Sequence, residues 1–448
     1  MATRYVNIDR DTALLLPPDM REWVGEDHLV HFILDAVGQL DVSAARVNTR
    51  GTGSEQYPPS LLLALLIYSY ASGVFSSRQI ERSTTDSVAV RVLCADPHPD
   101  HDTLCTFRRE NAGLLASAFA QVLELAAHCG VLKVAGITVA IDGTKILANA
   151  SKHAATSYGR ADQTMRQLDL EVAELLDKAQ QADATPLQDG LSVPAEVARR
   201  QTRRAKLAQA RAAIEARAYA RAIAEQAQRE PEQPGPPPPA PPAAKEQINF
   251  TDPDSAIMKA GNGQHFEQSY NAQAGVEVHS RLIVTQRVTR ATNDKEQLAP
   301  TFAALAPVIQ SVATVLIDSG FVSETAVRAV EEDATGQPTG VRVLAAVARQ
   351  PHGRTVAQLE KRPDPPEPPA EATFTARLAY RTATAAGRAQ YSLRQQTIEP
   401  VFGIMKEALG FRRFSLRGQA KVALEWTLVT LAYNLQRLHR LGATLRPA

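Results

Sequence analysis

The chain has few cysteines and almost no excess of either charge. Its 448 residues include three cysteines, too few for a disulfide framework, so we expect a reducing compartment. The 49 Lys and Arg residues nearly balance the 48 Asp and Glu residues, which leaves a net charge of +1. The chain as a whole therefore lacks the basic character that would by itself indicate nucleic-acid binding.

Long apolar runs are also missing. The longest, Leu61–Ile67, is far shorter than the roughly 20 residues that cross a bilayer, and the first residues lack the apolar segment of a signal peptide. We expect a soluble, cytoplasmic protein with no membrane partner. With 44% hydrophobic residues, the chain is long enough to form two or three domains.

The first 130 residues are predicted to form a helical N-terminal domain. Ser60–Gly73 reads as a buried helix, and Ser76 or Ser77 begins the next one. Two helices joined by a short glycine-containing turn resemble a DNA-binding helix-turn-helix, with a plain helical bundle as the alternative. The Cys94-x3-His98-x2-His101-x3-Cys105 pattern matches no common zinc module, so a loop is favoured there.

Residues 151–230 are predicted to form an inserted helical hairpin, followed by a proline-rich linker at 231–244. The helices cover Asp162–Gln181 and Pro194–Arg229, with Asp189 and Gly190 in the turn. The second helix is rich in arginine, and Arg203 and Arg204 are candidate contacts to DNA phosphates. The alternative is a solvated hairpin of alternating charge.

The order of the remaining elements predicts an α/β fold with a ribonuclease-H-like mixed sheet, built from 131–150 and 245–448. The predicted strands are 132–142, 270–278, 282–288, 312–317 and 341–347, and the predicted helices are 296–310, 323–332 and 377 to the end. A right-handed crossover sets strand 312–317 beside the first strand. Asp142 and Asp318, at the ends of these strands, then meet where open α/β sheets bind ligands.

Asp142, Asp318 and the helical Glu399 suit a two-metal phosphoryl-transfer site. Two divalent ions roughly 3.5–4 Å apart stabilise the attacking and leaving oxygens, and Mg²⁺ prefers carboxylate ligands. We expect Asp142 to bridge both ions, with Asp318 and Glu399 each binding one. The alternative for either aspartate alone is a turn residue at the end of a strand.

Further polar residues surround these acids in the sequence. Lys406 lies two helical turns after Glu399 and is a candidate contact to a phosphate, as is Tyr391 at the start of that helix. From Arg388 onward the chain contains ten basic residues, including Arg412 and Arg413, but only three acidic ones. Three other acids are expected to be caps or supporting residues: Asp252, Asp254 and Asp294. Of these, Asp294 is also a candidate additional metal ligand.

Several segments together resemble the DDE transposases of bacterial insertion sequences, and the resemblance covers nearly the whole chain. They are Ile141-Asp-Gly-Thr-Lys-Ile-Leu-Ala-Asn-Ala-Ser151, Thr251-Asp-Pro-Asp-Ser255, Tyr270-Asn-Ala-Gln273, Ile317-Asp-Ser-Gly-Phe321, Ile398-Glu-Pro-Val-Phe-Gly-Ile-Met-Lys406, Phe411-Arg-Arg-Phe414, Leu416-Arg-Gly418 and the region around Tyr57–Arg109 with Pro99-Asp-His-Asp-Thr103.

The resemblance implies a ribonuclease-H-like core with Asp142, Asp318 and Glu399 as catalytic acids. It also implies two Mg²⁺ ions (or Mn²⁺), double-stranded DNA partners comprising terminal inverted repeats and target, a homodimer in the DNA complex, and association with the nucleoid. In many relatives three residues separate the arginine and glutamate of the last motif. Here four residues follow Arg394, which removes it from the helical face of Glu399.

The expected function is a DNA transposase that cleaves the ends of its element and joins them to target DNA. Two alternatives stay open: a catalytically inactive or domesticated DNA-binding derivative, and a metal-dependent nuclease without strand transfer. Trp426 lies in an apolar helix and is expected in the core.

Overall fold

The computed structural model describes residues 19–47, 56–182, 192–229, 242–259, 265–347, 363–369 and 371–445. The predicted Asp189-Gly190 turn and linker residues 231–241 lie outside this part of the chain.

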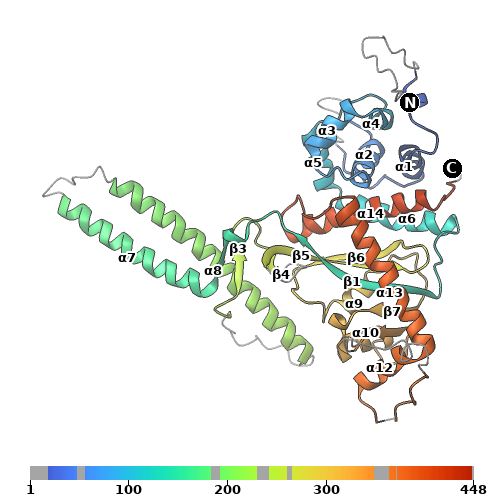
Figure 1. The fold of residues 1–448 in the computed structure, drawn as a ribbon. Helices are drawn as coiled ribbons and strands as arrows, with labels where there is room; N and C mark the ends of the chain where they lie inside the picture. The colour runs from blue at the N-terminus through green and yellow to red at the C-terminus, as the bar shows by residue number, and fades with distance from the viewer. Residues whose placement is uncertain are drawn as a thin grey trace, which may run out of the picture.

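The N-terminal region is helical, as predicted (Figure 1). Its helices are α1 (Leu29–Gly38), α2 (Pro59–Ala71), α3 (Ser77–Asp86), α4 (Val88–Cys94), α5 (His101–Glu110) and α6 (Ala112–His128), after a 3-10 turn at Met20–Trp23. Helix α2 is buried from Leu62 to Ala71. Gly73 ends it with φ 77°, and a Cβ there would lie 2.8 Å from the backbone oxygen of Leu409, so a larger residue would force this contact apart.

The two histidines of the proposed zinc pattern bind α3 instead. His98 Nδ1 lies 3.0 Å from Thr84 Oγ1, and His101 Nδ1 lies 2.8 Å from Glu81 Oε2. No group of three or more His, Cys, Asp or Glu side chains in the described ranges could hold a metal ion. The prediction of a loop is only partly right, because α4 ends at Cys94 and α5 begins at His101, which leaves residues 95–100 between the two helices.

The central sheet has the strand order of a ribonuclease-H-like fold. Its strands are β1 (Ile137–Leu147), β4 (Ala256–Lys259), β5 (Phe266–Glu277), β6 (Ile283–Thr289), β7 (Val312–Ile317) and β8 (Arg342–Ala345). The order is β6-β5-β1-β7-β8, with β4 pairing β5 beyond the end of β6. The first three strands pair antiparallel, and β7 lies parallel to both β1 and β8. The predicted placement of β7 beside β1 is confirmed.

Three local predictions were wrong. Strand β1 does not end at Asp142 but continues to Leu147, because β5 extends far enough to pair with it there. The helix predicted over 296–310 is only α9 (Leu298–Ala303), because the Ala306 amide donates to Val284 of β6 and draws the chain away. Strand β4, four residues long, was missed.

The chain segment inserted after β1 forms two long helices that project from the sheet (Figure 1). They are α7 (Tyr158–Ala182) and α8 (Val193–Arg229), close to the predicted bounds. A two-stranded sheet of β2 (Ala155–Ser157) and β3 (Gln247–Asn249) stands at their base. A helix of 37 residues spans roughly 55 Å, so α8 reaches well beyond the sheet.

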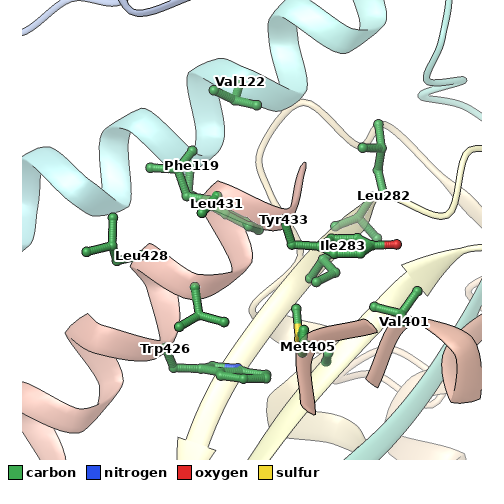
Figure 2. Packing of buried hydrophobic residues seen from close by; sticks show 14 of the residues in the cluster. Phe119, Val122, Leu282, Ile283, Val401, Met405, Trp426, Leu428, Leu431 and Tyr433 are labelled. Atoms are coloured by element: carbon green, nitrogen blue, oxygen red, sulfur yellow. The ribbon is translucent and has the colours of Figure 1, made fainter. Parts of the chain in front are cut away.

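The last helices cover the sheet and join it to the N-terminal region. After the short α10 (Glu324–Glu331) come α12 (Phe374–Ala383), α13 (Ala385–Gly403), a π-helical turn at Ile404–Ala408 and α14 (Gln419–Arg440). Helix α14 contacts α2, α6 and β6, and Figure 2 shows its residues packed between α6 and the strands. Trp426 is fully buried, as predicted, and one hydrophobic cluster runs from the N-terminal helices to β7.

A buried polar chain also links the N-terminal helices to α14. Arg108 of α5 donates to the Tyr70 hydroxyl at 2.6 Å, which in turn donates to Glu425 Oε1 at 3.4 Å. Glu425 accepts further hydrogen bonds from the Ser415 and Leu416 amides, at 2.9 and 3.0 Å. Burial raises the pKa of Glu425, and these donors and Arg108 offset part of that effect.

Asp252 and Asp254 cap the N-terminus of α14, as expected for loop caps. Asp252 is fully buried and accepts from the Gly418 amide at 3.1 Å and the Tyr270 hydroxyl at 2.9 Å. Asp254 accepts from the Gln419 amide at 3.0 Å. A carboxylate here satisfies helix amides that would otherwise be unpaired and interacts favourably with the helix dipole.

Replacing Asp252 by Ala should lower the free energy of unfolding by about 2–3 kcal/mol, because the buried Tyr270 hydroxyl and the half-buried Gly418 amide lose their acceptor. Chemical denaturation followed by circular dichroism measures the change. The matched substitution is Asp254→Ala, which removes one hydrogen bond at a half-buried site and should cost about 1 kcal/mol. Equal effects of the two substitutions would contradict the role of Asp252 as a buried cap.

Candidate active site

Two aspartates lie at one edge of the sheet, where the parallel pairing of β1 and β7 ends. The last parallel partners are Ile141 and Ile317, and Asp142 and Asp318 follow directly. β7 stops at Ile317, and Asp318 leads into the 3-10 turn Ser319–Phe321. The predicted meeting of these two residues at one edge is therefore observed, with Asp142 inside β1 rather than at its end.

Arg394 connects Asp142 to the third predicted acid. Its Nη2 lies 2.8 Å from Asp142 Oδ2, and its Nη1 lies 3.8 Å from Glu399 Oε1. Only 12% of the Arg394 side chain is exposed, against 52% for Glu399. The four residues between Arg394 and Glu399 therefore do not remove the arginine from the site, because its long side chain spans the distance that the helix geometry leaves.

Asp142 is a carboxylate in an unfavourable environment for charge. Burial raises its pKa to about 6, and the neighbouring Asp318 and Asp294 add to the effect, while Arg394 and the Gly143 amide oppose it. The amide of Gly143 donates to Asp142 Oδ1 at 2.8 Å. The site thus gathers more negative charge than its one neighbouring guanidinium balances.

A polar layer beside Asp142 depends on Gly143. Asn271 Nδ2 and Gln273 Nε2 of β5 both donate to Asp294 Oδ1, each at 2.7 Å. A Cβ on Gly143 would lie 2.3 Å from Gln273 Nε2 and 2.7 Å from Asp294 Oδ1. Any larger residue would displace this layer, which explains why glycine follows the aspartate.

The positions of Tyr391 and Lys406 along their helices differ from the predicted ones, since α13 begins at Ala385 rather than at Tyr391. The Tyr391 hydroxyl donates to the Ile317 carbonyl at 3.1 Å, so the tyrosine secures the end of β7 next to Asp318. Burial raises the pKa of Tyr391. Lys406 lies in the π-helical turn rather than two regular turns after Glu399. Burial lowers its pKa, and Arg412 lowers it further.

Arg412 and Arg413 lie on a loop that continues the edge of β1. The Leu147 amide donates to the Arg412 carbonyl, and the Phe414 amide donates to Leu147. Phe411 and Phe414 are fully buried, whereas the two arginines between them are exposed. Arg412 is ion-paired with Glu407. The loop therefore presents two cations to solvent at the end of the strand that carries Asp142.

On the inserted hairpin, the neighbouring residues Arg203 and Arg204 lie in different environments. Arg204 is ion-paired with Asp169 of α7, and its neighbours Arg199 and Arg200 are paired with Glu196. The Arg203 side chain makes no hydrogen bond or ion pair within the described part of the chain. Most of the α8 arginines near it thus serve the hairpin itself, and Arg203 does not.

The residues at the sheet edge have the chemistry of a divalent-cation site. Carboxylate oxygens of Asp142, Asp318 and Asp294 are the donors that Mg²⁺ and Mn²⁺ prefer. Burial raises the pKa of Asp142, and the charges of Asp318 and Asp294 raise it further. The described ranges hold no set of three acidic, His or Cys side chains close enough to form a metal site as they stand. Instead, the Arg394 guanidinium contacts both Asp142 and Glu399.

The strand order and the acids at one edge of the parallel pair β1 and β7 define a ribonuclease-H-like α/β protein. Comparison with known families agrees: residues 367–439 match a transposase DDE domain, and residues 18–110 match the transposase domain DUF772. No curated protein and no solved structure matches the chain significantly.

Together the two family matches support a DDE-type transposase of an insertion element. The DDE domain indicates a polynucleotidyl transferase or nuclease, in a family that acts on DNA and generally uses divalent metal ions. The match includes Glu399 and Lys406 but neither Asp142 nor Asp318. No helix in the described part of the chain is long and apolar enough to span a membrane.

The raised pKa of Asp142 predicts a pH-dependent stability in the absence of metal. The native state holds this proton more tightly than the unfolded chain does, so the contribution of Asp142 to the free energy of unfolding is full below about pH 4. It is lost as the pH rises through about 6. The loss amounts to about 3 kcal/mol at most.

The measurement compares Asp142→Asn with the unchanged protein by urea denaturation in EDTA. The stability of the variant relative to the unchanged protein should increase between about pH 4 and pH 7, because asparagine does not ionise. The contribution of Arg394 cancels from this pH-dependent difference as long as the arginine stays charged. A difference independent of pH would show that Asp142 ionises as freely in the native state as in the unfolded one.

Proposed function

We propose that this chain binds the terminal inverted repeats of its element, cleaves the element ends and joins the 3′-hydroxyls to target DNA. Asp142, Asp318 and Glu399 are the catalytic acids in this proposal. It rests on one observation above all: Asp142 and Asp318 directly follow paired residues of two adjacent parallel strands, and Arg394 joins Asp142 to Glu399. Three acids distant in sequence are thereby associated with one sheet edge.

The three acids would hold two divalent ions, Mg²⁺ or Mn²⁺. When bound, such ions stabilise the attacking and leaving oxygens of an in-line phosphoryl transfer. Asp294 is a further candidate ligand, held in place by Asn271 and Gln273. Without metal, the Arg394 guanidinium is ion-paired with Asp142. The buried position of Arg394 also holds α13, and therefore Glu399, against the strand ends.

The same surface offers cations for the DNA backbone. Lys406 lies on the turn that follows Glu399, and Arg412 and Arg413 lie at the end of β1. We propose that these residues, with Arg394 and Tyr391 at the acids and with Arg203 and Arg204 on the hairpin, contact or position the DNA. Phosphate contacts of this kind fix the register of a protein on DNA without reading its sequence.

The division of labour along the chain is part of the proposal. Residues 1–130 would bind DNA or support assembly, and residues 131–150 and 245–448 would form the catalytic domain, with the 151–230 hairpin and the 231–244 linker between its two parts. Two element ends must be held together for transposition, so a homodimer on DNA is expected. Association with the nucleoid would follow from DNA binding.

Asp142→Asn, Asp318→Asn and Glu399→Gln should each reduce metal-dependent cleavage of a DNA substrate carrying the inverted repeat by about a thousandfold or more. DNA binding in EDTA should change little, because these substitutions remove metal ligands rather than phosphate contacts. Gel-resolved cleavage and binding assays on the same substrate measure both quantities.

Glu324→Gln is a suitable control, since it neutralises an exposed carboxylate on α10 and should leave cleavage unchanged. Cleavage by any of the three variants at the rate of the unchanged protein would falsify its assignment as a metal ligand. Joined products with target DNA separate a transposase from a nuclease without strand transfer. A chain that binds the repeat but never cleaves it would be an inactive derivative.

A further inference from the structure

A basic groove with exposed aromatic rings lies at the base of the inserted hairpin. Two hollows of about 390 and 260 Å³ share the lining residues His153, Ala155 and Arg160 and therefore adjoin. They lie where the two-stranded sheet of β2 and β3 meets α7, α8 and the β4–β5 pair (Figure 1). None of the acids described in the active site lines this groove.

The charge of the groove is of one sign. Four cations line it, and no Asp or Glu is found among its described lining residues. The four are Lys152, Arg160, Arg203 and Lys206. Lys152 is paired with Glu267 at 3.2 Å. The side chains of Arg160, Arg203 and Lys206 are exposed and make no hydrogen bond or ion pair within the described ranges.

This arrangement differs from the rest of the hairpin. Other arginines of the hairpin form ion pairs with acids of the same hairpin: Arg166 with Asp162, Arg199 with Glu196, and Arg204 with Asp169. Three neighbouring cations without an ion-paired carboxylate create a local potential that favours an anionic ligand, although Arg203 interacts at longer range with Glu171.

Two phenylalanines give the groove its second chemical property. Phe250 and Phe266 line it and are 47% and 54% exposed. Aromatic rings interleaved with cations are the pattern by which proteins bind single-stranded nucleic acid, because bases stack on the rings while the backbone follows the charges. Paired bases within a duplex do not offer their faces to such rings.

The sheet register gives the distance between this groove and the candidate active site. Asp142 pairs with Ala274, and Phe266 lies eight residues further along β5, on the same face of the strand because side chains alternate. Eight strand residues span roughly 27 Å. For DNA that stays paired up to the groove, the phosphates of one strand are about 3.4 Å apart along the axis, so this distance corresponds to about eight nucleotides.

We propose that this groove binds a single-stranded segment of the DNA substrate about eight nucleotides from the scissile phosphate. Arg160, Arg203 and Lys206 bind its phosphates, and bases stack on Phe250 and Phe266. The inference rests on the proposed DNA function for its biological setting. Binding itself does not depend on the catalytic acids, so it is measured on the full chain in EDTA with a labelled 12-nucleotide oligothymidylate.

The first test uses two double variants that remove the same charge. Arg160→Ala with Arg203→Ala should weaken oligonucleotide binding and make the slope of log affinity against log salt shallower by about 1.4, the value for two lost single-strand phosphate contacts. Arg166→Ala with Arg199→Ala removes two exposed arginines that are paired with acids, and should leave affinity and slope unchanged. Equal effects of the two double variants overturn the proposal.

The second test separates stacking from charge. Phe250→Ala and Phe266→Ala should each weaken binding roughly tenfold without changing the salt slope, because each removes a stacking platform. Leu170→Ala, at a 68% exposed apolar residue on α7, is the matched control and should have no effect. If both phenylalanine variants bind like this control, or if a 12-base-pair duplex loses as much affinity as the single strand, the single-strand assignment is wrong.

The third test concerns position and separates the two proposals. Photo-crosslinking from a reactive base moved stepwise from the cleavage point should give maximal attachment near Phe266 at about eight nucleotides; a maximum next to the cleavage point overturns the inferred distance. Asp142→Asn should still bind the oligonucleotide. Cleavage that survives Asp142→Asn defeats the catalytic assignment alone, whereas groove variants that bind normally defeat only the groove.

Discussion

The parallel pairing of β1 with β7 is the constraint on which the rest of the structure depends. It brings Ile141 and Ile317, 176 positions apart, into register and so sets Asp142 and Asp318 at one sheet edge. The long hairpin inserted between β1 and the later strands does not disturb that register, because its two ends pair with each other as β2 and β3 outside the central sheet. Helix α13 then only has to cross the strand ends for Glu399 and Arg394 to arrive there.

The candidate active site is a less favourable environment for charge than the core that carries it is for its polar groups. Buried α14, with Trp426 and the carboxylate caps Asp252 and Asp254, satisfies most of its polar groups. At Asp142, by contrast, burial and neighbouring carboxylates favour the protonated form. Such an unfavourable charge is tolerated in a native structure when the surrounding packing holds it in place, and it is typical of sites that bind cations or perform chemistry.

Several predictions from sequence held because local chemistry determines them. Alternating apolar runs predicted β5 and β6, and the apolar segment before Asp318 predicted β7. Other features could not be found this way. The role of Arg394 depends on where α13 crosses the strands, and its five-residue spacing from Glu399 argued against it. The predicted length of α9 was too great, because residues 305 and 306 pair with β6. This tertiary interaction overrides the helix periodicity of the sequence.

By itself the sequence determined the element order, the ribonuclease-H-like sheet and the identity of Asp142, Asp318 and Glu399 as candidate acids, because periodicity and strand-end position are local properties. Only the tertiary structure decided which cations are free and which are paired. Arg203 and Arg204 are adjacent in sequence and chemically identical, yet one lines an open groove and the other pairs with Asp169. The reason is that successive helical residues point about 100° apart, so what each one meets depends on the neighbouring elements.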